Sequence, residues 1–362
     1  MNETPQTLLE AIKFFGEGDN AFVFFSQLRW PDGVVKCPRC YSPKVIAIPT
    51  RKTWECKCCV TQKQFSIKTG TIFEDSLIKL EKWLAGVWLI VNAKNGVSSY
   101  EIHRALGVTQ KTAWFMLQRI RLAMQTGTFL KFAGQVEVDE TFIGGKARFM
   151  HKERNEERGK GQTGGAGKSV VLGFLERSSK DRHSQVRTIH VPNQRRTNLH
   201  PKVRENVEPG SEVFTDALKS YNELNPEFQH QFIDHAERYV DGQIHTNGME
   251  NFWSLLKRSI KGTYVSVEPF HLFRYLDEQV FRFNKRGLND GERFLKVMEG
   301  VSGKRLTYKA LTGKIGERPG QIKKSWRGIP RLKPETVDKV LGQMALPDSQ
   351  LIETNEPGSI AP

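Results

Sequence analysis

Four of the five cysteines have the spacing of a zinc site. Two residues separate Cys37 from Cys40, and two residues separate Cys56 from Cys59. Two such turns place four thiolates in a tetrahedron around one Zn²⁺ ion. Disulfides are the alternative, and a reducing compartment disfavours them. We predict a zinc ribbon with a structural Zn²⁺, and Cys58 is the spare thiol because only the pair at 56 and 59 preserves the spacing.

Three carboxylates stand where a catalytic metal site would need them. Asp139 and Asp216 end predicted strands, and Glu250 lies in the first turn of a predicted helix. Mg²⁺ prefers oxygen ligands, and two such ions activate the attacking oxygen and stabilise the leaving oxygen in phosphoryl transfer. Adjacent strands would bring the two aspartates together. The three acids are therefore the candidates for binding two Mg²⁺ ions, for which Mn²⁺ is an expected substitute.

Neighbouring residues compete for these roles. Glu137 shares a strand face with Asp139, whereas Glu140 points to the opposite face. Asn247 lies about one helical turn before Glu250, so it is a helper or an alternative third residue.

Four further residues lie near the acids in the sequence. Lys257 is two turns beyond Glu250, placed to contact a DNA phosphate, and Arg258 follows it. Asp234 and His235 follow the fifth predicted strand of the acid-bearing region and are weaker catalytic candidates.

The stretch GQTGGAGKS at 161–169 has the GK[ST] ending of a phosphate-binding loop. That pattern requires glycine at the position of Gln162 and a helix after the loop. The next residues, SVVLGFLER, are typical of a strand instead. We predict a glycine-rich loop that leads into a strand, and no nucleotide cofactor.

The charge balance is strongly basic. The chain of 362 residues has 55 Lys and Arg against 40 Asp and Glu. Such a balance favours a polyanionic partner, usually nucleic acid. The first residues lack the features of a signal peptide, and the most apolar run, WLAGVWLIV, is too short to span a bilayer. We expect a cytoplasmic, nucleoid-associated protein that does not enter a membrane.

A pair of short helices is expected after a core helix at 77–94. The first begins after Ser98 or Ser99 and ends at Gly107, and the second begins just beyond a short turn. This is the pattern of a helix-turn-helix, although an ordinary helical hairpin is the alternative. The expected DNA-contacting residues at the start of the second helix are Thr109, Gln110, Lys111 and Thr112.

Three successive strands and then alternating helices and strands are predicted from about residue 135. This order predicts an α/β core, a mixed sheet flanked by helices, of the ribonuclease H-like type. Beyond about residue 315 the chain is rich in Gly, Pro and Lys, and its end has the composition of a disordered segment. The expected segments are a zinc-ribbon domain with an N-terminal helix at 1–75, a helix-turn-helix at 76–127, the catalytic core at 128–290 and a basic extension at 291–362.

The sequence resembles the ISXO-like insertion-sequence transposases, which join a zinc-ribbon head to a DDE-type catalytic core. The resemblance covers residues from about 20 to 286 and rests on CPRC, WECKCC, KTGTIFEDS, GVTQKTAWFMLQRIR, VEVDETFIGG, FTDALKSY and HTNGMENFWSLLKRSIKGTY. It implies that Asp139, Asp216 and Glu250 form the metal-binding triad. Related transposases with Asn as the third member keep Asn247 as an alternative.

The resemblance implies a DNA transposase. Such an enzyme binds the terminal inverted repeats of its element, hydrolyses a phosphodiester at the element end and joins the freed 3′-hydroxyl to target DNA. The expected partners are double-stranded transposon ends, target DNA and further copies of the chain in a synaptic complex. Two alternatives fit the same residues: a ribonuclease H-like nuclease or resolvase without strand transfer, and a non-catalytic zinc-ribbon DNA-binding regulator.

Overall fold

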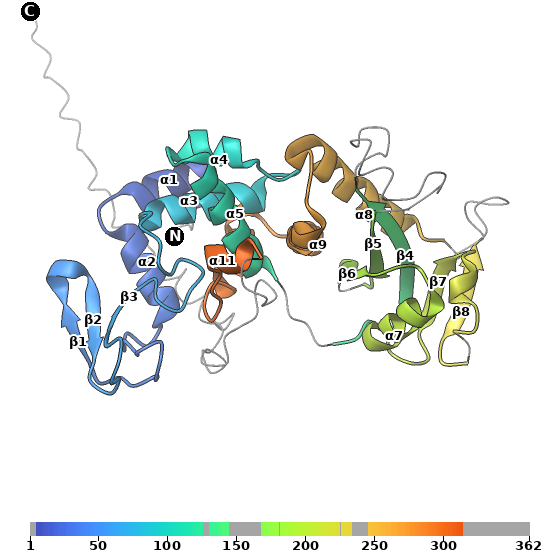
Figure 1. Cartoon of the computed structure of the whole chain (residues 1–362), viewed down its shortest axis with the longest axis horizontal. Helices are drawn as coiled ribbons and strands as arrows, with labels where there is room; N and C mark the ends of the chain where they lie inside the picture. The colour runs from blue at the N-terminus through green and yellow to red at the C-terminus, as the bar shows by residue number, and fades with distance from the viewer. Residues whose placement is uncertain are drawn as a thin grey trace, which may run out of the picture.

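The structure, a computed structural model, describes residues 5–125, 130–144, 168–180, 182–224, 226–233 and 245–313. A helical region with a small sheet lies on one side of the molecule, and a larger sheet with its own helices lies on the other (Figure 1). Within the described ranges, no helix is long and apolar enough to cross a membrane. The expectations for Asp234, His235, the glycine-rich stretch at 161–167 and the basic end of the chain lie outside these ranges.

The small sheet carries the cysteines. Its three antiparallel strands are β1 (Val45–Ile48), β2 (Thr53–Cys56) and β3 (Gln64–Ser66), in the order β1-β2-β3. Trp54 on the central strand packs edge-on against Trp30 at 5.0 Å between ring centroids and stacks on Phe65 at 5.8 Å. Aromatic packing of this kind stabilises a sheet too small to bury much aliphatic surface.

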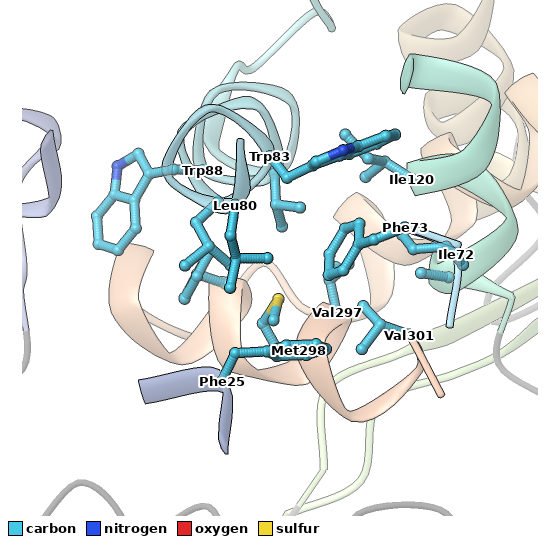
Figure 2. Close-up of a cluster of buried hydrophobic side chains, with 14 of the residues drawn as sticks. Phe25, Ile72, Phe73, Leu80, Trp83, Trp88, Ile120, Val297, Met298 and Val301 are labelled. Atoms are coloured by element: carbon cyan, nitrogen blue, oxygen red, sulfur yellow. The ribbon is translucent and has the colours of Figure 1, made fainter. Parts of the chain in front are cut away.

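The N-terminal helices share one hydrophobic core with a helix from much later in the chain. The helices of this core are α1 (Leu8–Gly16), α2 (Asn20–Arg29), α3 (Leu80–Asn92), α4 (Ser99–Leu106), α5 (Gln110–Met124) and α10 (Asp290–Glu299). The short helix α11 (Tyr308–Leu311) belongs to a separate small cluster with Leu122 of α5. Figure 2 shows Phe25, Phe73 and Trp83 packed with Met298 of α10. Residues after 290 therefore contribute to the N-terminal core and pack against the first helices of the chain.

Helices α4 and α5 begin and end where the sequence predicts. Ser98 caps α4, and its hydroxyl accepts a hydrogen bond from Glu101 N at 3.2 Å. Gly107 ends this helix in the left-handed conformation, at φ 59°, which glycine adopts without steric cost. Thr109 then caps α5 by accepting from Thr112 N at 3.2 Å. The tight turn between two capped helices is confirmed.

The larger sheet has five strands in the order β6-β5-β4-β7-β8. The strands are β4 (Gln135–Ile143), β5 (Ser169–Glu176), β6 (Gln185–Val191), β7 (Glu212–Asp216) and β8 (Gln229–Ile233). β4, β5 and β6 pair antiparallel, whereas β4, β7 and β8 pair in parallel. Glu137 is opposite Phe214, so the same register extended by two residues sets Asp139 beside Asp216. Asp216 ends β7 as predicted, but the prediction that Asp139 ends its strand is wrong, because β4 continues to Ile143 in its pairing with β5. Ser169 opens β5, which confirms that the GK[ST] sequence leads into a strand.

Helices cover both faces of this sheet. They are α7 (Arg196–Asn206) on one face, and α8 (Asn247–Ser259) and α9 (Leu272–Asn284) on the other. Val136 and Val138 of β4 face the α7 core, whereas Val171 and Leu175 of β5 face α8 and α9. The alternation of apolar side chains between the two faces follows from the period of a strand. The predicted mixed sheet with flanking helices is confirmed.

Helix α8 approaches β5 so closely that only glycine fits beneath it. A Cβ atom at Gly173 would lie 2.2 Å from Met249 Cε and 2.6 Å from Trp253 Cζ2. We expect Gly173→Ala to lower the free energy of unfolding by about 1–3 kcal/mol, because overpacking forces side chains or backbone to shift. Urea unfolding measures the change.

Gly16→Ala is the matched control for this substitution. No atom lies within 4 Å of the Cβ position at Gly16, so we expect little change or a slight stabilisation there. Equal stabilities of the two variants would contradict the close approach of α8 to the sheet.

Candidate functional site

The four cysteines of the two Cys-x2-Cys motifs lie in one cluster. Their sulfur atoms all lie within 4.8 Å of one another, with 3.8 Å between Cys37 and Cys59 and 3.4 Å between Cys40 and Cys56. Four sulfurs at 2.3 Å from a central ion in a tetrahedron are about 3.8 Å apart. The donor set and its spacing therefore fit Zn²⁺, with no position left open for a substrate.

Cys58 stands apart from the cluster. Its side chain is exposed, and its sulfur lies 3.1 Å from Ser42 Oγ. Its backbone N–H donates to Cys56 Sγ at 3.4 Å. Burial raises the pKa of Cys56, but this hydrogen bond and the neighbouring thiols lower it to about 7. Burial and the surrounding thiols raise the pKa of Cys59. Four thiolates this close repel one another, so all four sulfurs could be deprotonated together only with a bound cation between them.

The zinc cluster predicts a contrast between two serine substitutions. We expect Cys37→Ser to lose most of the bound zinc and to make the N-terminal region sensitive to protease, because it removes one of four ligands. Cys58→Ser makes the same chemical change outside the cluster and should keep one zinc per chain. Elemental analysis of the purified variants measures both. Full zinc occupancy in Cys37→Ser, or its loss in Cys58→Ser, would reverse the assignment.

The first turn of α5 is the accessible part of that helix. Lys111 is exposed, and its Nζ lies 4.9 Å from the ring centroid of Tyr308. Gln110 donates to Ser99 Oγ at 2.8 Å and so links α5 to α4. Trp114 and Phe115 beyond this turn are half-buried, and all residues from 116 to 124 are buried. Any contact between α5 and a partner is therefore restricted to its beginning.

A polar cavity of about 560 Å³ lies between the second half of β4 and helix α8. Three acids and three bases line it together with Thr141, Trp253 and Ser254. The acids are Asp139, Glu140 and Glu250, and the bases are Lys257, Arg258 and Lys261. Burial lowers the pKa of Lys257, which the negative charge of Asp139 partly opposes. Mixed charge of this kind can bind divalent cations and phosphate oxygens in the same space.

Asp139 is the most perturbed acid of this cavity. Its carboxylate accepts hydrogen bonds from Trp253 Nε1 at 2.9 Å and from Glu140 N at 2.8 Å. Burial, followed by repulsion from Glu140 and Asp216, nevertheless raises its pKa to about 7. Asp216 does not line the cavity, but it lies close enough to act on both neighbouring acids. The parallel pairing of β4 with β7 thus concentrates negative charge at one sheet edge.

Glu140 is held from the other face of the sheet. Its two carboxylate oxygens accept hydrogen bonds from Tyr221 Oη and from Gln194 Nε2, each at 2.5 Å. Tyr221 is fully buried in the α7 core, which agrees with the expected direction of Glu140. No spacing in the sequence points to Tyr221 or Gln194, because only the folded topology brings them to β4.

Glu137 binds the start of α8. It is buried, and it accepts hydrogen bonds from Met249 N at 2.9 Å and from Arg177 Nε at 2.8 Å. A carboxylate at this position pairs with the free backbone N–H groups and the positive end of the helix dipole. Glu137 therefore fixes the helix that carries Glu250.

Glu250 and Asn247 are both exposed on the first turns of α8. Glu250 lines the polar cavity, whereas Asn247 is not among its lining residues. Apart from the cysteine cluster, no three Cys, His, Asp or Glu side chains in the described ranges bring their ligand atoms within 4.8 Å. The acids consequently border an open cavity and do not form a closed cage for a single ion.

Comparison with known proteins places these sites in a family. Residues 131–284 match the ISXO2-like transposase domain, and residues 17–62 match the transposase zinc-ribbon domain. A transposase-like protein of Haemophilus influenzae is 34% identical over 115 residues, which are 32% of this chain and 93% of that protein. The chain belongs to the ISXO2-like transposase family. A protein in transposable element ISH50 of Halobacterium salinarum is 28% identical over 260 residues, covering 68% of this chain and 84% of the relative.

The family domains coincide with the two sites described above. The ISXO2-like domain spans the large sheet with α7, α8 and α9, and the zinc-ribbon match contains all four clustered cysteines. The family predicted from the sequence is thereby confirmed.

The raised pKa of Asp139 predicts an unusual stability change in the metal-free protein. An acid with a raised folded-state pKa binds its proton more tightly when folded, so stability falls as pH rises from about 4 to about 7. We expect metal-free Asp139→Asn to be more stable than wild type at pH 8, by about 1 kcal/mol or more. The difference should disappear below about pH 4. Urea unfolding in buffer without Mg²⁺ or Mn²⁺, and without a chelator that would remove the structural Zn²⁺, measures it.

Asp32→Asn provides the control with the opposite sign. A hydrogen bond from Lys36 lowers the pKa of Asp32, so neutralising this carboxylate should not stabilise the fold. A metal-free Asp139→Asn protein less stable than wild type at pH 8 would contradict the charge crowding inferred for the cavity.

Proposed function

We propose that this transposase-family chain cuts and joins DNA by metal-dependent phosphoryl transfer at the polar cavity beside α8. One observation carries the proposal: Asp139 and Glu250 line the same cavity, and Asp216 lies close enough to Asp139 to raise its pKa. Clustered carboxylates are costly to the fold unless something positive neutralises them. Divalent cations would do so, and the oxygen donor set suits Mg²⁺ or Mn²⁺.

Asp139, Asp216 and Glu250 would hold two Mg²⁺ ions, which would activate the attacking oxygen and stabilise the leaving oxygen of a phosphodiester. The protein supplies the positions. Trp253 fixes the orientation of Asp139, and Glu137 fixes the helix that bears Glu250. The cavity side chains of Lys257 and Arg258 are placed to bind phosphate oxygens of DNA.

The strand order supports a ribonuclease H-like core. Three antiparallel strands are followed by two strands parallel to the first, with Asp139 in the middle of β4 beside Asp216 at the end of β7. We assign residues 128–290 to this core, 1–75 to the ribbon domain with its structural Zn²⁺, 76–127 to the helix-turn-helix and 291–362 to an extension. Terminal-repeat recognition by the ribbon and by Lys111 at the start of α5, and oligomerisation during synapsis, belong to the same proposal.

Glu250→Gln tests the catalytic assignment most sharply. The amide keeps the shape of the side chain but replaces an anionic ligand by a neutral oxygen. We expect cleavage and strand transfer in Mg²⁺ to fall at least about 100-fold, while DNA binding changes little. Gel assays with a labelled element end, and with a pre-cut end plus a target plasmid, measure the two steps.

Asn247→Ala is the competing arm of that experiment, because Asn247 can supply at most a neutral ligand or a hydrogen bond. If Glu250→Gln retains normal activity while Asn247→Ala is inactive, Asn247 replaces Glu250 in the site. Cleavage by wild type without joining of a pre-cut end would indicate a nuclease or resolvase. DNA binding without either reaction would indicate a non-catalytic regulator.

A further inference from the structure

A second cavity lies on another side of α8, between the sheet and the end of α3. Its volume is about 670 Å³. Gly248, Asn251 and Leu255 of α8 line it, a stripe at helical spacing. Glu250, Ser254 and Lys257 form a different stripe of the same helix and line the catalytic cavity instead. A single helix thus forms a wall of both cavities.

Basic side chains dominate the lining of this second cavity. They come from the end of α3, from the end of β5, from α9 with the turn after it, and from α10: Lys94, Arg177, Arg282, Arg286 and Arg293. Glu137 is the one acid among the residues that line the cavity, and it is occupied by Arg177 and by the start of α8.

Carboxylates do not neutralise all of these bases. Arg282 pairs with Glu278, and Arg293 pairs with Asp290. Lys94 and Arg286 have no carboxylate partner in the part of the chain that the structure describes. Two positive charges at this cavity are therefore available for an anion.

The guanidinium of Arg286 is held in place without being neutralised. It donates to Ser184 O at 2.9 Å, to Ser184 Oγ at 2.7 Å and to Phe283 O at 2.7 Å. A cation fixed by neutral acceptors loses little side-chain freedom when an anion binds, so it is prepared for one.

We propose that this second cavity, bordered by Lys94 and Arg286, binds the phosphate backbone of the DNA that the catalytic cavity cuts or joins. The choice of DNA as the anion rests on the proposed function. A helix with its side chains is about 10–12 Å wide, and phosphates of one strand follow at about 3.4 Å along the duplex. A single DNA molecule can therefore contact both stripes of α8 within a few nucleotides.

Arg177 links this cavity to the start of α8. Its guanidinium lines the cavity and pairs with Glu137, which binds the start of α8. A DNA phosphate bound in the cavity would therefore lie near the contacts that position Glu250.

The salt dependence of DNA binding tests this site. The full-length protein is titrated with a fluorescent mixed-sequence duplex in metal-free buffer at several salt concentrations. Each phosphate contact contributes about 0.9 to the slope of log K against log salt. We expect Lys94→Gln to reduce the slope by about one, and Lys94→Gln with Arg286→Gln to reduce it by about two.

Lys13→Gln on α1 is the matched control. Lys13 is exposed and lines none of the cavities described here, so the variant has the same charge change elsewhere. Slopes for the Lys94 variants equal to the wild-type slope, or a fall of the same size in Lys13→Gln, would overturn the proposal. If the double variant unfolds, Lys94→Gln decides, because Lys94 is exposed at the end of α3.

This readout is separate from catalysis. If the wild-type protein neither cuts nor joins DNA, but the Lys94 variants show the expected change in salt slope, this site is supported and the proposed reaction is contradicted. If the wild-type protein is active and the slopes of the Lys94 variants are unchanged, the reaction is supported and this site is contradicted.

Discussion

The docking of α8 on the large sheet is the constraint on which both cavities depend. Glu137 accepts a hydrogen bond from Met249 N at the start of the helix, and Gly173 leaves the space into which Met249 and Trp253 pack. Because this contact fixes the axis and rotation of α8, it sets one stripe of the helix toward Asp139 and another toward the basic cavity. A shift of the helix would move Glu250 relative to both aspartates, so the site requires close packing several residues away from the acids.

A second buried interaction joins the N-terminal helices to this arrangement. Arg121 on α5 donates to Glu278 on α9 at 2.6 Å, and both side chains are almost completely buried. Tyr264, in the π-helical turn after α8, donates to the same carboxylate at 2.5 Å. Removing one member would leave an uncompensated buried charge, which is strongly destabilising. Helices α5 and α9 and the turn after α8 are therefore fixed to one another through a single carboxylate, which connects the helical region to the region of the large sheet.

The sequence predicted the local features well because they depend on short-range chemistry. Ser98, Gly107 and Thr109 set the ends of α4 and α5, the cysteine spacing set the ribbon, and alternating apolar residues set the strands. Adjacent strands were expected to bring Asp139 and Asp216 together, and the pairing of β4 with β7 does so, although Asp139 lies inside its strand and not at its end.

Long-range packing could not be predicted in the same way. The bond from Glu137 to the start of α8, the contacts of Tyr221 and Gln194 with Glu140, and the packing of α10 in the N-terminal core join distant segments. No spacing rule in the sequence encodes these contacts. In the sequence, Glu137 competes with Asp139 because both lie on one strand face. Only the position of the start of α8 above Glu137 gives the two acids different surroundings.

The most direct test of this account is anomalous X-ray scattering from Mn²⁺ in crystals of the full chain bound to an element end. The account predicts two Mn²⁺ peaks coordinated between them by the carboxylates of Asp139, Asp216 and Glu250, next to a DNA phosphate. The account would be contradicted by Mn²⁺ peaks that Glu137 or Asn247 coordinates without Glu250. It would equally be contradicted by a DNA phosphate bound at the cavity beside α8 while none of the three acids coordinates Mn²⁺.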